Sequence, residues 1–295
     1  MSRFASILLP LDGSPEAAKG ARCALWLADA LGATLHVVHA TPHPVPAPDE
    51  LARLRVPHAQ RASVVVHQIQ GDAVAAVLAE MAAHRIDLVV MSARGESACA
   101  DAAPSHRLGS IAHAVISRSP APVVLLPVHS RDSLPWTSML AAASGEAAAD
   151  RALASAVRLA ADLRLKVTVV HCEDGPSERR STALGAAYAD APHHEYPKRL
   201  EQLVERGLTR CTQQEMGCIG EVLLCRGEPA SALLEQAARL GSSVMALGWH
   251  GALGVDRALV FKRLLEEAQC ALLVVPGPEE GARTRLKVGS EIGET

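Results

Sequence analysis

The chain contains two copies of one segment, and this duplication constrains its fold more than any other feature of the sequence. The first copy comprises IDLVVMSARG (86–95) and LGSIAHAVISRSPAPVVLLP (108–127), and the second comprises SSVMALGWHG (242–251) and FKRLLEEAQCALLVVP (261–276). Each copy reads as an apolar strand, a glycine loop, a helix and another apolar strand. A repeat of about 150 residues is far longer than the units of a solenoid, so it predicts two similar domains.

Apolar strands alternate with alanine-rich helices in both halves of the chain. The first half predicts strands at 6–11, 34–40, 63–68, 87–92 and 122–127, helices at 15–31, 72–85 and 108–117, and at most a short helix within 41–59. The second half predicts strands at 138–142, 166–171, 220–225, 243–248 and 271–275, and helices at 147–163, 195–216, 229–240 and 256–268. This alternation indicates an α/β fold with two consecutive doubly wound, Rossmann-like sheets, each of five mostly parallel strands.

The domain boundaries follow from the same pattern. We expect one domain at 1–130, a second at 136–277, and a linker around HSRDSLPW (129–136). Residues 278–295 lack apolar periodicity, so we expect a mobile tail.

Composition and charge exclude several classes of protein. The formal net charge of −3 and the pI near 6.5 give no basic surface for nucleic acid or an anionic membrane. The sequence shows no membrane-spanning run and no signal peptide. Seven cysteines without a C-x-x-C pair fit neither a disulfide framework nor a structural zinc site. These features favour a cytoplasmic protein, and the lack of a nucleophile–base motif favours a binding module over a dedicated enzyme.

Polar and glycine residues follow several of the predicted strands in the first half. Asp12 follows the first strand, Arg94 and Gly95 follow the fourth, and Gly109-Ser110 opens a helix. Ligands of open parallel sheets bind at the carboxyl ends of the strands, so these residues should converge there. A carboxylate can bind ribose hydroxyls, and the free N–H groups of a helix start can bind a phosphate. Together they suggest a nucleotide site.

These segments resemble the universal stress protein family. The resemblance is carried by ILLPLDGS, the G-D-A sequence at Gly71, MSARG and GSIAHAVISRSPAPVVLLP, and it extends over both halves, as in tandem-domain members. It implies a fold like that of adenine-nucleotide α-hydrolases, a role in regulating the stress response, and binding of ATP or another adenine nucleotide, with weak ATP hydrolysis at most. The nucleotide-contacting positions it implies are Pro10, Asp12, Ala40, Met91, Ser92, Arg94, Gly95, Gly109, Ser110 and Ile111.

Two departures from the family pattern concern the phosphate loop. ATP-binding relatives carry G-x-x-G, nine residues and then G-[S/T], whereas here Ser92 replaces the first glycine and thirteen residues separate Gly95 from Gly109. This longer spacer brings Glu96 and Asp101 near any phosphates, so ATP would require a divalent cation such as Mg²⁺.

The second half keeps less of the pattern. Alanine is expected at the position of the acid in AAASGE (141–146), and the glycine–serine pair is replaced by Ala258-Leu259 or Phe261-Lys262, depending on the alignment. Gly248, His250 and Gly251 preserve the G-x-x-G loop. We expect this half to be mainly structural, or to bind something other than ATP.

The sequence leaves alternatives open for the role of its histidines, for its assembly and for its function. Base rates favour a solvated loop over a metal site for His193-His194, and His36 and His39 lie on opposite faces of one strand, so no metal site is assigned and metal binding by the histidines is kept as a third, less favoured alternative. His39 and His171 occupy equivalent positions, for which a structural role is expected.

Pairing of 123–127 with 272–276 would make the chain a pseudo-dimer, with homodimerisation open. The alternative function is a scaffold that binds no nucleotide and acts through protein contacts or another small ligand.

Overall fold

The structure is a computed structural model that describes residues 3–54, 56, 64–95, 108–131, 133–173, 196–250 and 258–277. The strands of its first half are β1 (Ser6–Pro10), β2 (Thr34–Ala40), β3 (Val64–Ile69), β4 (Leu88–Ser92) and β5 (Val123–Leu126). Those of its second half are β6 (Ser138–Ala142), β7 (Lys166–Glu173), β8 (Ile219–Arg226), β9 (Val244–Trp249) and β10 (Ala271–Pro276). Every predicted strand is therefore present, with ends that differ by at most two residues.

The described helices of the first half are α1 (Pro15–Leu31), α2 (Ala47–Arg53), α3 (Ala73–Ala83) and α5 (Ser110–Arg118). The second half contains α6 (Ala147–Leu163), α8 (Tyr196–Leu208), α9 (Gln213–Met216), α10 (Pro229–Leu240) and α11 (Leu259–Glu267). The predicted start of α1 is confirmed, because Ser14 Oγ accepts a hydrogen bond from Ala17 N at 3.1 Å and Pro15 occupies the first turn.

The single long helix predicted at 195–216 is wrong, because the chain breaks it into α8 and α9. The Thr212 side chain accepts from Glu215 N, and the Glu215 side chain accepts from Thr212 N. This reciprocal capping box starts a new helix and so ends the continuous pattern.

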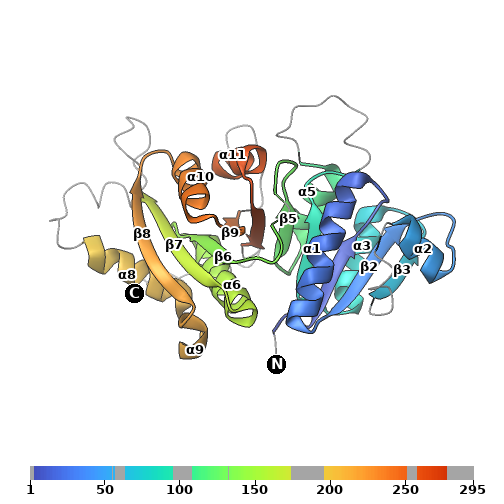
Figure 1. The fold of residues 1–295 in the computed structure, drawn as a ribbon, viewed down its shortest axis with the longest axis horizontal. Coiled ribbons are helices and arrows are strands. Elements are labelled where there is room, and N and C mark those ends of the chain that lie inside the picture. Colours follow the sequence, from blue (N-terminus) through green and yellow to red (C-terminus); the bar gives the residue numbers. More distant parts are fainter. Residues whose placement is uncertain are drawn as a thin grey trace, which may run out of the picture.

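Ten strands form one continuous sheet in the order β3-β2-β1-β4-β5-β10-β9-β6-β7-β8 (Figure 1). All neighbouring pairs are parallel except β5 and β10, which pair antiparallel with Val124 opposite Leu273. The expected pairing of the two last strands within one chain is therefore present, and it makes one sheet out of two similar halves.

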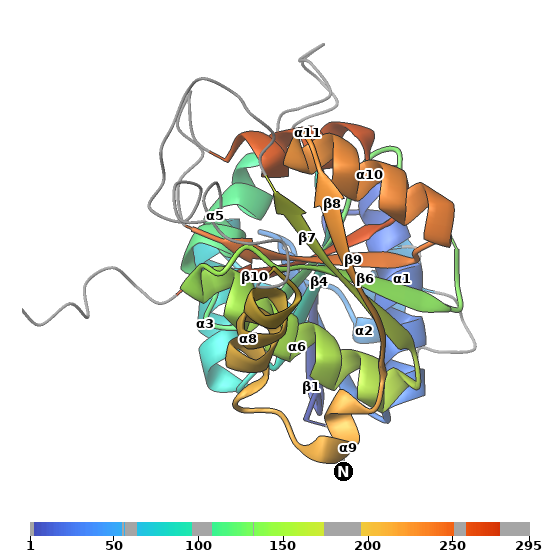
Figure 2. The ribbon, with the colours of Figure 1, turned by 90° about the vertical axis from the view of Figure 1, so that its left-hand side faces the viewer.

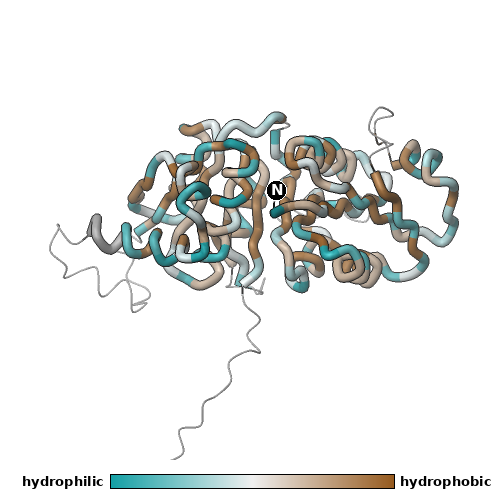
Figure 3. The backbone as a smooth tube through the Cα atoms, turned by 90° about the horizontal axis from the view of Figure 1, so that it is seen from below, coloured by the Kyte–Doolittle hydropathy of each residue, from teal (hydrophilic) through white to brown (hydrophobic). Residues whose placement is uncertain are grey.

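Helices cover both faces of this sheet (Figure 2). Buried residues of α1, α2, α6 and α8 form one core cluster, and those of α3, α5, α10 and α11 form another. Each cluster draws residues from both halves, and hydrophobic residues concentrate along the strands (Figure 3). Trp26 of α1 also packs on Trp136, which precedes β6, with ring centroids 5.3 Å apart. The two halves thus share a continuous core.

No helix in the described parts of the chain is both long and apolar enough to cross a bilayer. The predicted tail at 278–295 lies outside the described residues.

Candidate functional site

A pocket of about 390 Å³ lies where the carboxyl ends of β1, β2 and β4 meet the start of α5. This volume is within the range of small-molecule sites. All ten residues predicted to contact a nucleotide line it, namely Pro10, Asp12, Ala40, Met91, Ser92, Arg94, Gly95, Gly109, Ser110 and Ile111. The topology brings them together because parallel strands place their carboxyl ends along one edge of the sheet.

Asp12 is held in place by the turn that follows β1. Its Oδ1 accepts a hydrogen bond from Ser14 N at 3.0 Å, and Gly13 between them has a φ of +83°, which favours glycine. A carboxylate has about four acceptor positions, so Asp12 can accept further hydrogen bonds from a ligand.

Gly95 allows the loop after β4 to approach Asp12 closely. A Cβ at Gly95 would overlap Asp12 Oδ2, and a Cβ at Gly109 would lie 3.3 Å from Ala93 O and 3.9 Å from Gly95 N. Gly109 N also donates to Ala93 O at 2.8 Å. Asp12, the β4 loop and the start of α5 are therefore in contact around one pocket.

The start of α5 supplies amide groups to this pocket. The first backbone hydrogen bond of the helix runs from His113 N to Gly109 O at 2.9 Å. The N–H groups of Ser110, Ile111 and Ala112 precede that bond, so helix geometry leaves them without an intrahelical acceptor. With the helix dipole, these groups favour an anion.

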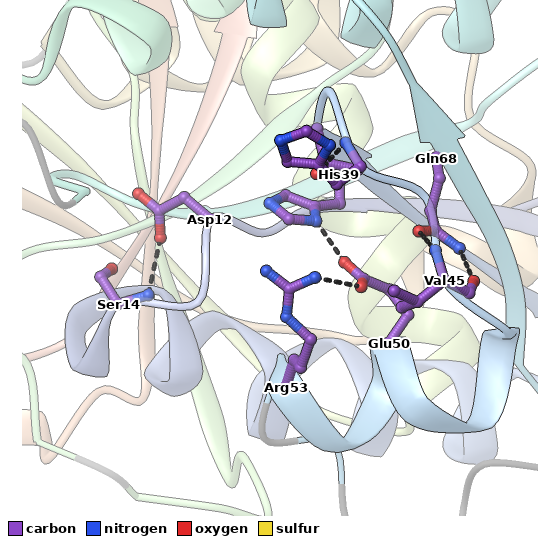
Figure 4. Close-up of polar contacts among 9 residues, drawn as sticks. Asp12, Ser14, His39, Val45, Glu50, Arg53 and Gln68 are labelled. Atoms are coloured by element: carbon purple, nitrogen blue, oxygen red, sulfur yellow. Dashed lines mark hydrogen bonds and ion pairs between the residues drawn. The ribbon is translucent and has the colours of Figure 1, made fainter.

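His39 lines the pocket as well, which the sequence did not predict. Its Nδ1 pairs with Oε1 of Glu50, and Arg53 Nη1 lies 3.4 Å from Glu50 Oε2. Glu50 is fully buried, so its charge requires such partners. In Figure 4 the imidazole of His39 faces Glu50 on α2, while Asp12 lies at the end of β1. The contact depends on α2 folding over β2, and no local pattern near His39 signals it.

Ser92 uses its hydroxyl within the protein. Its Oγ donates to the carbonyl of Glu16 in α1 at 2.5 Å. The glycine of the family pattern is thus replaced by a serine that ties β4 to α1. Glu96 and Asp101 lie outside the described residues.

The second half has aromatic side chains where the first half has pocket-lining alanines. Gly13 and Gly145 share a φ of +83°, so Ser144, not alanine as expected, is the counterpart of Asp12. Trp249 and Phe261 correspond to the pocket-lining Ala93 and Ala112, are both buried, and pack with ring centroids 5.0 Å apart. Serine thus replaces the acidic residue, and two bulky side chains replace two small ones.

The remaining predicted residues of the second half do not form a comparable site among the described residues. Gly248 packs on α6, where a Cβ would lie 2.5 Å from Ala149 N and 2.7 Å from Ala148 O, and His250 is exposed. Gly251 lies outside the described residues, and α11 begins after Ala258, which confirms the alignment on Ala258-Leu259.

The histidine predictions have separate outcomes. His193 and His194 lie outside the described residues. His171 is buried, and its Nδ1 lies 2.7 Å from Ala143 O, a contact that fits the expected structural role. His36 and His39 lie on opposite faces of β2. His36 lies near Glu80 of α3, whereas His39 contacts Glu50 of α2.

Comparison with known proteins identifies relatives of the whole chain. It resembles the crystal structure of a universal stress protein from Archaeoglobus fulgidus DSM 4304, with 15% identity, a TM-score of 0.64, and coverage of 93% of this chain and 99% of that one. A putative universal stress protein from Pseudomonas aeruginosa UCBPP-PA14 has 16% identity, a TM-score of 0.60, and coverage of 93% and 94%. These likenesses show the fold. No curated protein matches the chain.

A family model described as the universal stress protein family matches residues 3–62, 47–127 and 135–276. These matches cover most of both halves, including every strand of the ten-stranded sheet. The chain therefore belongs to the universal stress protein family.

Proposed function

We propose that residues 1–130 form a domain that binds an adenine nucleotide, ATP with Mg²⁺ in the first instance, and that 136–277 form a mainly structural second domain. The protein would act as a cytoplasmic stress-response regulator whose state depends on that nucleotide. The observation that carries the proposal is the contact of Asp12, Gly95 and the start of α5 around one pocket.

The pocket offers a different chemistry to each part of the ligand. Val38, Val77 and Met91 line an apolar region suited to a base. In the neutral tautomer whose Nδ1–H donates to Glu50, the Nε2 of His39 would be an acceptor, which suits the exocyclic amino group of adenine. Asp12 would accept from the ribose hydroxyls.

The phosphates would lie against the start of α5. The Ser110 hydroxyl and the guanidinium of Arg94 line the pocket beside the helix amides. Arginine and free backbone N–H groups both favour phosphate oxygens. Mg²⁺ would offset part of the negative charge of the phosphates.

Isothermal titration with ATP and Mg²⁺ tests this function. Asp12→Ala removes charge-assisted hydrogen bonds of about 1.5–3 kcal/mol, so affinity should fall about tenfold or more. The matched control is Ser144→Ala, the same position in the second half, which should bind ATP like the original protein. No saturable binding at millimolar ATP would contradict the proposal and favour the scaffold function.

A further inference from the structure

Three histidines from separate elements meet on the face of the sheet that α3 covers. His36 comes from β2, His67 from β3, and His84 directly follows α3. His36 Nδ1 lies 3.0 Å from His67 Nε2, and the centroid of the His84 ring lies 4.6 Å from each of the other two. One ring nitrogen from each residue lies within 4.8 Å of the others.

Strand register explains why these residues meet. His36 pairs with Val65 across the β2–β3 ladder, so its side chain shares a face with Val65 and with His67 two residues on. Glu80 and His84 are four residues apart, one helical turn, so α3 brings both over that face.

Glu80 provides the carboxylate that such a cluster needs. Its Oε2 lies 2.9 Å from His67 Nδ1 and 3.0 Å from His84 Nε2. That oxygen is buried and makes no well-aligned hydrogen bond to any described residue. Metal-binding histidines usually donate their second ring N–H to such a carboxylate, which orients the ring and makes it a better ligand.

We propose that His36, His67 and His84 bind a zinc ion, with Glu80 as the carboxylate that orients two of the imidazoles. His36 would use Nδ1 and His67 Nε2, which leaves His67 Nδ1 to donate to Glu80. Tetrahedral zinc with bonds of about 2.0–2.1 Å requires nitrogens about 3.3 Å apart. The 3.0 Å pair is near this value, and the His84 nitrogen, within 4.8 Å of the others, would move inward when the ion binds.

The surroundings leave a route for the ion. The His84 side chain is 36% exposed, and β3 is an edge strand, so the cluster opens to solvent on that side. Three protein ligands leave the fourth position to a water molecule. The cluster is separate from the nucleotide pocket, since Ala73 and Val77 line that pocket from the opposite end of α3.

The test uses the full chain, stripped of metal and titrated with ZnCl₂ in competition with a chromophoric chelator. One zinc ion per chain is expected, and His84→Ala should weaken binding by more than tenfold. Glu80→Gln should weaken it by about 10–100-fold, the usual effect of losing an orienting carboxylate. The matched control is His129→Ala, an exposed histidine outside the cluster, which should leave affinity unchanged.

Further measurements test whether a loss of zinc binding reflects misfolding, whether cysteines bind the zinc, and whether zinc binding depends on the nucleotide site. Circular dichroism confirms that each variant folds, and His84 is exposed enough for its removal to be tolerated. Cobalt substitution should show no thiolate charge-transfer band. Asp12→Ala should bind zinc normally, so failure of the nucleotide proposal would leave this one standing. No zinc binding, equal affinity in His84→Ala, or a thiolate band would overturn it.

Discussion

At the scale of single residues, the pocket depends on the absence of a side chain at Gly95. A Cβ there would overlap Asp12 Oδ2, so Gly95→Ala must displace either the carboxylate or the loop. We expect ATP affinity to fall about tenfold or more, as for loss of a charge-assisted hydrogen bond. Calorimetry on Gly95→Ala measures it. The control is Gly220→Ala in β8, where a Cβ meets nothing closer than 3.8 Å, and equal affinity in both variants would refute the explanation.

Burial makes individual cysteines unreactive. It raises the pKa of Cys23 to about 12 and that of Cys270 to about 11. The thiolate is the reactive form, so at pH 8 both should react with iodoacetamide far more slowly in the folded protein than after unfolding, and faster as the pH rises. Mass spectrometry after a short pulse measures each site. Labelling of Cys23 in the folded protein as fast as in urea would contradict this prediction.

At the scale of elements, the close packing of β9 on α6 depends on the absence of a side chain at Gly248. A Cβ at Gly248 of β9 would lie 2.5 Å from Ala149 N and 2.7 Å from Ala148 O of α6, whereas the equivalent Ser92 of β4 is accommodated against α1 and donates to Glu16 O. Gly248→Ala should therefore lower the free energy of unfolding by about 1–3 kcal/mol through overpacking.

The companion variant is Ser92→Ala, which loses only the hydrogen bond to Glu16 O and should cost about 0.5–1.5 kcal/mol. Denaturant unfolding compares the two variants. A Gly248→Ala protein as stable as the original would show that β9 and α6 are not in the close contact described.

Element-level features differ in how well the sequence predicts them. Apolar runs bounded by turn residues locate the strands because burial on both faces leaves a continuous signal. The break between α8 and α9 also has a local signal, the Thr212–Glu215 capping box, which the amphipathic pattern on either side obscures. The His39–Glu50 pair has no local signal, since α2 and β2 meet only in the folded chain.

At the scale of the whole molecule, the pairing of β5 with β10 should make the two halves unfold together in one cooperative transition. Leu273 of β10 is fully buried opposite Val124 of β5, within a core cluster that spans both halves. Leu273→Ala should cost about 2–5 kcal/mol and shift one common transition for both halves.

Calorimetry detects this shift, and Val222→Ala is the control, because that side chain on β8 is 41% exposed and should matter little. Two separate transitions, of which the variant shifts only one, would show that the halves unfold independently.

The duplicated sequence predicts two similar sheets whose last strands pair with each other. In the structure this β5–β10 pairing joins the two sets of five strands into one ten-stranded sheet. The ten pocket residues were predictable because the loops that carry them follow strands at one edge of the sheet. The zinc ligands were not, because His36, His67 and His84 are far apart in sequence and meet only through register and helix placement.

The most direct test of the account is the number of ATP molecules that one chain binds. The first half has Asp12 and a pocket, whereas the second half has Ser144 in place of the acid and buried Trp249 and Phe261 in place of two pocket-lining alanines. Isothermal titration of the full chain with ATP and Mg²⁺ should therefore give one site, weakened about tenfold or more in Asp12→Ala and unchanged in Ser144→Ala. Two sites per chain, or none, would contradict the account.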